Sequence, residues 1–202
     1  MSKRIKDSCW YGGNEIYEKM IQGAQGVLFP KLENSDHFPV LRNLLELCQG
    51  SSSIIDVGCG AASLGDLVSI EYTGCDLPSI IENVSQKLHP SFKFIKFDVM
   101  EDKVDFLSEY DIVVMNAFID VMEEPLIVLN KVLEKSKKYV IIHRQKISET
   151  TKSSETSSYT GFSFSSSLSK SDISRSLDRF SFEVEKMIFW TPEFCSFLVK
   201  KK

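Results

Sequence analysis

The sequence lacks the patterns that mark secreted, membrane-spanning and metal-binding proteins. Its five cysteines are scattered without a CxxC pair, which predicts reduced thiols and a cytoplasmic location. No apolar run is long enough to span a bilayer, and the basic opening MSKRIKDSCWYGG has no apolar core of a secretory signal. Because no His, Asp and Glu residues stand at the spacing of metal ligands, we expect no metal site.

The sequence also has no excess of basic residues. The 24 Lys and Arg residues against 28 Asp and Glu residues give a net charge of −4. Proteins that bind nucleic acid or membrane surfaces usually present a basic face, so we expect neither as a partner. The expected partner is a small molecule, and the chain is expected to be a monomer or a homodimer. Its 202 residues, 43% of them hydrophobic, fit a single domain.

Short apolar runs alternate with helical patterns through the middle of the chain. Helical spacing first occurs at 14–24 and 35–48. Strands are expected at 53–57, 72–76, 92–99, 110–116 and 138–144, with helices between them at 61–69, 78–88 and 123–135. This alternation predicts an α/β fold, in which a parallel sheet has helices on both faces.

The last quarter of the chain differs in composition. Residues 148–174 are rich in Ser and Thr with interspersed aromatics, which predicts a loop that folds over another part of the molecule. A helix at 169–178 and an antiparallel hairpin at 180–201 are expected to follow. The domain therefore divides into an N-terminal helical cover (1–50), a cofactor-binding core (51–147) and a closing part (148–202).

One turn combines small residues with a preceding aspartate, in the stretch SSIIDVGCGAASLGDLVS at 52–69. Gly58 and Gly60 carry no Cβ, so a ligand can approach their backbone closely. Ligands of open α/β sheets bind beyond the carboxyl ends of the strands, and the helix predicted at 61–69 would offer free N–H groups to an anion. Polar residues end the next strands, namely Asp76, which follows Asp56 by 20 residues, then Asp98 and Asn116.

The stretch DVGCGAA resembles the first motif of class I S-adenosylmethionine-dependent methyltransferases, an acidic residue followed by G-x-G-x-G, with Ala62 at the third glycine. The resemblance extends over 54–142 and includes the closing hairpin. It implies a single three-layer α/β/α domain with a seven-stranded, mostly parallel sheet in the order 3-2-1-4-5-7-6 and an antiparallel C-terminal hairpin. More loosely, VIIHRQKI and the later YTGF resemble bacterial small-molecule methyltransferases.

The resemblance implies S-adenosylmethionine as cofactor and S-adenosylhomocysteine as product. Asp56 would fix the turn or reach the methionine ammonium, Asp76 would hold the ribose hydroxyls, and Asp98 would accept from the adenine amino group. The other residues implied at the cofactor are Gly58, Cys59, Gly60, Leu77, Val99, Asn116 and Ala117. Aspartates that end strands are also common helix N-caps, a role that stays open for Asp98.

The expected acceptor is the hydroxyl group of a small molecule. His143 ends the fifth apolar strand, so we expect it to face the ligand crevice as a general base, or else only to bond a neighbouring loop. Aromatic residues from both ends of the chain would bind and cover the acceptor, or simply pack on the outer helices. These residues are Tyr11, Tyr17, Tyr159 and Phe162.

Two other functions stay open. A nicotinamide-dependent oxidoreductase shares this type of sheet, although Ser63 stands where a dinucleotide fingerprint has its third glycine. A non-catalytic protein could use the same fold to bind the cofactor or to scaffold a partner, and Ala62 in the glycine motif leaves that alternative open.

Overall fold

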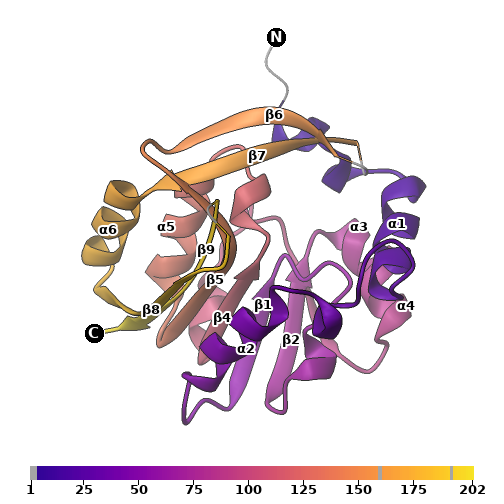
Figure 1. The fold of residues 1–202 in the computed structure, drawn as a ribbon. Helices are drawn as coiled ribbons and strands as arrows, with labels where there is room; N and C mark the ends of the chain where they lie inside the picture. The colour runs from indigo at the N-terminus through magenta and orange to yellow at the C-terminus, as the bar shows by residue number, and fades with distance from the viewer. Residues whose placement is uncertain (1–3, 159–160, 192) are drawn as a thin grey trace.

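A nine-stranded sheet forms the centre of the computed structural model, which describes residues 4–158, 161–191 and 193–202 (Figure 1). The strands are β1 (Ser53–Val57), β2 (Glu71–Asp76), β3 (Lys93–Lys96), β4 (Ile112–Asn116), β5 (Tyr139–Ser148), β6 (Lys152–Ser158), β7 (Gly161–Ser169), β8 (Phe182–Phe189) and β9 (Phe194–Lys201). Strands β3-β2-β1-β4-β5 are parallel, and the antiparallel strand β9 joins β5 to β8. The α/β fold with an antiparallel closing hairpin is thereby confirmed, and β6 and β7 are two strands more than expected.

Helices cover both faces of the sheet. They are α1 (Asn14–Ala24), α2 (Phe38–Glu46), α3 (Pro78–Ile80), α4 (Gln86–Leu88), α5 (Pro125–Lys135) and α6 (Lys170–Arg179), and a π-turn (Ile81–Ser85) joins α3 to α4. Helix α2 packs on one face of the sheet, and α5 and α6 pack on the other (Figure 1). No helix of the described segments is long and apolar enough to cross a membrane.

Side chains of β5 alternate between the two cores. Val140 and Ile142 belong to the core under α5 and α6, whereas Tyr139 and Ile141 belong to the core under α2. This period of two directs the next side chain, His143, toward α2.

The helix predicted at 61–69 is not formed, and the described chain has there only a 3-10 turn at Gly65–Leu67. Gly, Ser and Asp in this stretch lower helix propensity. Gly65 also packs so closely that a Cβ on it would lie 2.4 Å from Cε2 of Phe92 and 2.9 Å from Cδ1 of Tyr72. The first crossover of the sheet therefore offers a ligand no helix N-terminus.

The loop predicted from the Ser- and Thr-rich composition is instead the β6–β7 hairpin, which arches over one end of the sheet (Figure 1). Strand β7 also pairs in parallel with the end of β5. Its small serines let it pack closely over the 3-10 turn Ile119–Val121, while Phe164 and Leu168 enter the core. Hydrogen bonds satisfy its hydroxyls, such as the 2.7 Å bond between Ser167 and Ser148.

Substituting Gly65 by Ala distinguishes the observed turn from the predicted helix. In an exposed helix, Gly→Ala would stabilise the protein by about 1 kcal/mol. Here the new methyl group would displace the rings of Phe92 and Tyr72, so we expect a loss of about 1–3 kcal/mol in the free energy of unfolding. Urea denaturation measures the difference, and a stabilised variant would contradict the turn.

Candidate active site

Three residues of the turn after β1 adopt left-handed backbone conformations. The φ angle is 73° at Gly58, 53° at Gly60 and 57° at Ala62. A Cβ on Gly58 would lie 2.1 Å from Cδ2 of Phe118, so this position requires glycine. Ala62 adopts the conformation that a third glycine would adopt more easily, at a cost of about 1–2 kcal/mol.

The carboxylate of Asp76 fastens this turn to the end of β2. Its Oδ2 accepts from the backbone N–H of Gly60 at 2.8 Å, and its Oδ1 accepts from that of Leu77 at 2.7 Å. Burial raises the pKa of Asp76 to about 6, although the two backbone hydrogen bonds lower it. Each oxygen keeps further acceptor capacity, so the carboxylate can also bind a pair of ligand hydroxyls.

Asp98 lies just past the end of β3. Its Oδ1 accepts from the backbone N–H of Met100 at 2.9 Å, a local turn bond that matches the capping role left open by the sequence. Its Oδ2 accepts from the hydroxyl of Tyr11 at 3.0 Å. Burial and the nearby Asp98 charge both raise the pKa of the Tyr11 phenol, which therefore stays a hydrogen-bond donor.

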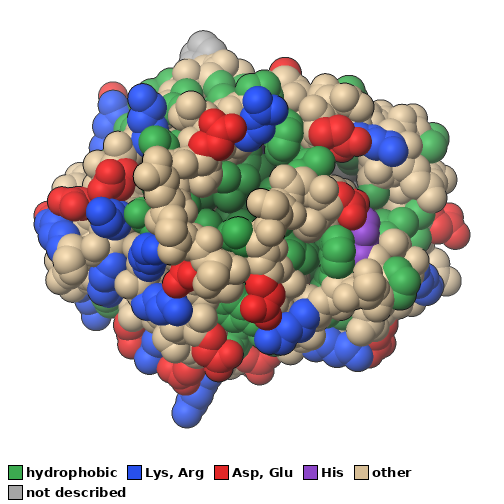
Figure 2. All heavy atoms as spheres, turned by 90° about the horizontal axis from the view of Figure 1, so that it is seen from below, with side chains coloured by type: hydrophobic (Ala, Val, Ile, Leu, Met, Phe, Trp, Pro, Cys, Tyr) green, Lys and Arg blue, Asp and Glu red, His purple; other side chains and the backbone are tan. Residues whose placement is uncertain are grey.

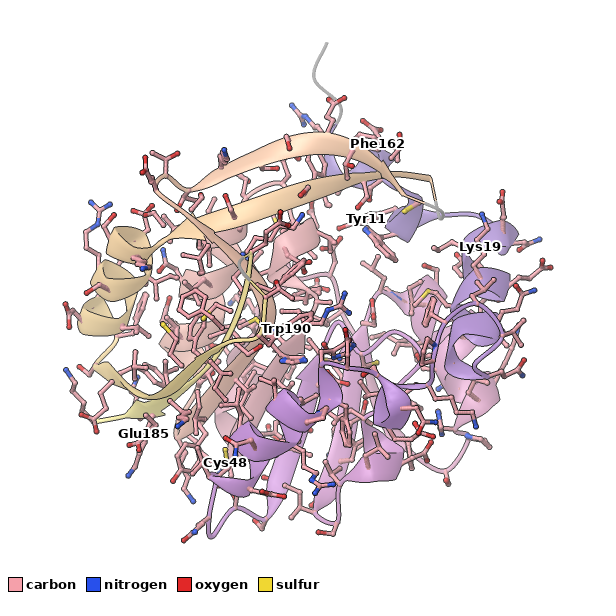
Figure 3. All side chains as sticks on the ribbon, in the orientation of Figure 1. Tyr11, Lys19, Cys48, Phe162, Glu185 and Trp190 are labelled. Atoms are coloured by element: carbon pink, nitrogen blue, oxygen red, sulfur yellow. The ribbon has the colours of Figure 1, made fainter. Side chains whose placement is uncertain are left out.

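Asp76 and Asp98 face one cavity of about 100 Å³ at the carboxyl ends of the parallel strands. The N-terminal segment closes it, because Trp10 Nε1 donates to Ser163 Oγ on β7 at 3.0 Å. Figure 3 shows Tyr11 below the end of the β6–β7 hairpin that carries Phe162. The residues predicted from the sequence that line this cavity are Tyr11, Gly58, Gly60, Asp76, Leu77, Asp98, Val99 and Ala117.

Asp56 and Cys59 lie behind the lining of the cavity. Asp56 Oδ2 accepts from the Tyr72 hydroxyl at 3.1 Å, and its buried Oδ1 has no partner among the described residues. Burial raises the pKa of Asp56 to about 7, helped by the charge of Asp76 and opposed by the Tyr72 bond. The Cys59 side chain is buried in the core, where burial raises its thiol pKa, so only its backbone belongs to the turn.

His143 does not lie where the sequence suggested. It is 1% exposed and absent from the cavity lining, because the alternation along β5 directs it toward α2. Its Nδ1 is 2.8 Å from Ser196 Oγ and its Nε2 is 3.0 Å from Nδ1 of His37. Both ring nitrogens are therefore occupied, which matches the open alternative of a bond to a neighbouring element. Burial lowers the pKa of His143 to about 3.

The predicted aromatic residues occupy different places. Tyr11 lines the cavity, whereas Tyr17 on α1 and Phe162 on β7 do not. Phe162 packs edge-on against Phe164 at 5.4 Å between ring centroids. Tyr159 lies outside the described residues. No three His, Cys, Asp or Glu side chains in the described part of the chain could together hold a metal ion.

Asn116, which was predicted at the cofactor, does not line the cavity, and its buried Oδ1 has no partner among the described residues. Three polar residues that the sequence analysis missed share both properties, through Asp120 Oδ1, Arg144 Nε and Trp190 Nε1. Asp120 stands four residues after Asn116, and Arg144 follows His143, but neither spacing carries a recognisable signal in the sequence.

The structure is similar to solved methyltransferases that share little of its sequence. The N-terminal domain of EvdMO1 with S-adenosylhomocysteine bound gives a TM-score of 0.61 at 13% identity, covering 95% of this chain and 99% of that one. CalS10, an amino pentose methyltransferase from Micromonospora echinaspora, gives 0.61 at 8%, covering 85% and 94%. Magnesium protoporphyrin IX methyltransferase (ChlM) from Synechocystis PCC 6803 gives 0.56 at 15%, covering 98% and 88%. The fold is thus that of the class I S-adenosylmethionine-dependent methyltransferases.

The sequence assigns the chain to a family. Residues 38–145 match the family described as methionine biosynthesis protein MetW, which is more than half of the 202 residues. The chain belongs to the MetW family. A search of curated proteins finds no match to it.

We expect the stability of the protein to depend on pH between about pH 4 and 7. Burial raises the pKa of Asp56 to about 7, so the folded chain keeps a proton that the unfolded chain loses near pH 4, and this contribution to stability is lost as the pH rises from about 4 to 7. Asp76 and Asp120, whose pKa burial raises to about 6, act in the same direction. Burial lowers the pKa of His37 to about 4 and of His143 to about 3, so their contribution to stability is instead lost as the pH drops below about 6.5.

Each group contributes at most about 1.4 kcal/mol per pH unit, which urea denaturation between pH 5 and 8 can resolve. Asp56→Asn removes this contribution, so the difference in unfolding free energy between wild type and variant should change in favour of the variant from pH 5 to 7 and stay constant from pH 7 to 8. A difference that does not change between pH 5 and 7 would contradict the assignment.

Proposed function

We propose that this protein transfers the methyl group of S-adenosylmethionine to a hydroxyl of a small molecule. One observation carries the proposal: Asp76 and Asp98, at the ends of adjacent parallel strands, share a cavity with the glycine turn at 58–60. Carboxylates at these ends suit a ligand that offers a ribose diol and an amino group.

The residues present fit such a cofactor. The free acceptor capacity of Asp76 suits the two ribose hydroxyls, and Asp98 Oδ2 suits the amino group of adenine. Leu77, Phe97 and Val99 line the cavity with apolar surface for the adenine ring. The partnerless Oδ1 of Asp56 under the turn is a buried acceptor that suits the methionine ammonium, directly or through a water molecule.

The cavity must open before the whole cofactor can enter. Sites for ligands of drug size measure about 300–1,000 Å³, against about 100 Å³ here. Tyr11 already bonds Asp98, and the ring of Phe118 lies against Gly58 where a ligand would approach the turn. The N-terminal segment and Phe118 are therefore the parts that must move.

The cofactor, when bound, supplies an electrophilic methyl group. The protein then needs to bring the acceptor into line with it, exclude water and take up the hydroxyl proton. Trp10 and Tyr11 line the cavity and are placed to exclude water, and the bond from Trp10 to Ser163 ties this segment to the β6–β7 hairpin.

A small-molecule acceptor agrees with the charge of the protein and with its structural neighbours. The net charge is −4, and acidic and basic side chains intermingle on the face drawn in Figure 2. The neighbours include an amino pentose methyltransferase, a magnesium protoporphyrin IX methyltransferase and a domain studied in the presence of S-adenosylhomocysteine and D-fucose. A cytoplasmic location stays a prediction from the scattered cysteines.

A second candidate function is that of a non-catalytic protein that uses the methyltransferase fold to scaffold a partner. The contact between the Tyr11 hydroxyl and Asp98 favours it, because the chain itself occupies the acceptor that the adenine amino group needs. Turnover of an acceptor by the purified protein separates the two candidates.

We expect the protein to bind S-adenosylmethionine and S-adenosylhomocysteine with similar affinity, because Asp76 and Asp98 would contact parts that both share. Asp98→Asn should weaken the binding of both ligands by about 10–100-fold, since one charge-assisted hydrogen bond is worth about 1.5–3 kcal/mol. Calorimetry measures this, with Asp178→Asn on the exposed side of α6 as the control. Binding of a nicotinamide dinucleotide in place of both ligands would overturn the assignment.

Tyr11→Phe should tighten the binding of S-adenosylhomocysteine by about 5–10-fold. The substitution removes a hydrogen bond worth about 1–1.5 kcal/mol that competes for Asp98, while the ring stays in the cover. Calorimetry on the variant and on Tyr17→Phe, which alters the aromatic residue outside the lining, provides the comparison. Weaker binding by the Tyr11 variant would mean that its hydroxyl belongs to the closed, ligand-bound state.

A further inference from the structure

Four buried polar atoms without a partner belong to residues near the carboxyl ends of β4 and β5. They are Asn116 Oδ1, Asp120 Oδ1, Arg144 Nε and Trp190 Nε1, four of the eleven such atoms in the described part of the chain. Leaving a buried polar group without a partner costs about 1–3 kcal/mol. Because similar atoms occur elsewhere, such as Thr73 Oγ1 in β2, it is the position of these four at the ligand-binding edge of the sheet that points to a ligand as their partner.

Each atom comes from a different element at the same end of the sheet. Asn116 ends β4 and pairs in register with His143 of β5, and Arg144 is the next residue along β5. Asp120 lies in the 3-10 turn after β4, and Trp190 directly follows β8. Figure 3 shows Trp190 and Tyr11 both below the β6–β7 hairpin.

The cluster adjoins the cofactor cavity through the chain itself. Ala117 and Phe118, which stand between Asn116 and Asp120, line that cavity. The backbone N–H of Ala117 donates to the carbonyl of His143 at 3.1 Å, which fixes the end of β4 beside β5. A molecule bound by the four atoms would therefore lie next to the cofactor.

The backbone of Arg144 is strained, and a specific bond holds it in place. Its φ of 63° is left-handed, at an irregularity in the pairing of β5 with β9. Its backbone N–H donates to Ser196 Oγ at 3.2 Å. Backbone strain of this kind costs about 1–3 kcal/mol and clusters at functional sites.

The cluster contains a carboxylate, Asp120, and a guanidinium, Arg144, that form no ion pair with each other. Burial raises the pKa of Asp120 to about 6, while the charges of Arg144 and Lys146 lower it. The described ion pairs nevertheless include none between Asp120 and Arg144. The four atoms are inaccessible to solvent in this structure and none of their residues lines a described cavity, so the cluster must open to admit a ligand group between the two charges. His37 and His143, the other titratable groups beside Arg144, have pKa values lowered mainly by burial and stay neutral near pH 7.

We propose that Asn116, Asp120, Arg144 and Trp190 form the acceptor site, that it takes a neutral ring compound with neighbouring hydroxyl groups, and that Asp120 is the general base. The proposal rests on the methyltransferase function proposed above. Two of the four atoms accept hydrogen bonds and two donate them, and a hydroxyl group does both. An anionic acceptor would be attracted by Arg144 and Lys146 but repelled by Asp120, and a cationic acceptor the reverse, so the mixed charges favour neither sign over a neutral compound.

The ring of the acceptor would lie on Trp190. The indole stacks on Phe194, with ring centroids 5.4 Å apart at 17°, and lies 5.9 Å from the ring of His37. This stacked pair places an aromatic ring next to polar atoms, the combination that a ring with hydroxyls at its rim requires.

The step attributed to Asp120 balances without another reactant. The hydroxyl oxygen attacks the sulfonium methyl carbon, an O–C bond forms, and the S–C bond breaks with its electron pair left on sulfur. The hydroxyl proton passes to the carboxylate of Asp120. The products are the methyl ether, S-adenosylhomocysteine and a protonated Asp120.

Calorimetry on the protein saturated with S-adenosylhomocysteine tests the site without requiring turnover. The probes are the neutral sugars D-fucose, D-xylose and L-rhamnose, with D-glucuronate and D-glucosamine as charged counterparts. We expect at least one neutral sugar to bind, and each charged sugar to bind at least about tenfold more weakly. Trp190→Ala and Asp120→Ala should each lower the affinity for the neutral sugar by about tenfold or more.

The substitution Asp120→Asn distinguishes a role as general base from a role in binding the sugar alone. It should keep sugar binding within about threefold and slow methyl transfer to that sugar by about 100-fold or more. Asp178→Asn, an exposed carboxylate on α6, should change neither quantity. An undiminished transfer rate in Asp120→Asn would overturn the role of the base.

Three results would overturn the site or its ligand class. They are no binding of any neutral sugar to the loaded protein, preferential binding of a charged sugar, and unchanged sugar binding in both alanine variants. Failure of the wild type to bind S-adenosylhomocysteine is a different result, since it refutes the methyltransferase proposal itself.

Discussion

The two hydrogen bonds that Asp76 accepts determine the shape of the whole ligand-binding edge. The bond from Gly60 joins the turn after β1, with its left-handed residues at 58, 60 and 62, to the end of β2, and the local bond from Leu77 fixes the orientation of the carboxylate. The same carboxylate faces the cavity, beside the buried Asp56 whose pKa its charge helps to raise. Two carboxyl groups this close under one turn cost stability near neutral pH. A cationic or hydroxyl-bearing ligand would relieve that cost, which gives a physical reason for placing them there.

The absence of a helix after this turn changes how the site can bind anything. A helix N-terminus would supply free N–H groups and a positive dipole, but the 3-10 turn Gly65–Leu67 is too short for that. Recognition therefore depends on side-chain carboxylates and on cover from distant parts of the chain. The N-terminal segment and the β6–β7 hairpin provide this cover and are tied to each other by the bond between Trp10 and Ser163. Segments that precede and follow the parallel strands thus meet over a site built by those strands.

The sequence predicted correctly those features that depend on the periodic spacing of apolar residues and on polar residues at strand ends. The five parallel strands, the closing hairpin and the placing of Asp76 and Asp98 at one edge follow from short apolar runs that end in polar residues. The patterns failed where tertiary packing decides. Gly65 fits against Phe92 rather than in a helix, and the serines of β7 are buried because their hydroxyls find partners. The cluster around Arg144 depends on an irregularity in strand pairing, which leaves no mark in the sequence.

His143 shows how a residue singled out by its position can serve the site indirectly. Ser196 Oγ accepts from the backbone N–H of Arg144 and can donate its own proton to His143 Nδ1. His143 then carries its proton on Nε2 and donates it to His37 Nδ1, so all three bonds are satisfied by neutral rings. Burial lowers the pKa of both histidines and keeps them in this neutral state. Through Ser196, this chain of bonds holds the strained backbone of Arg144 and so helps to orient its guanidinium. His143 thus supports the site without touching a ligand.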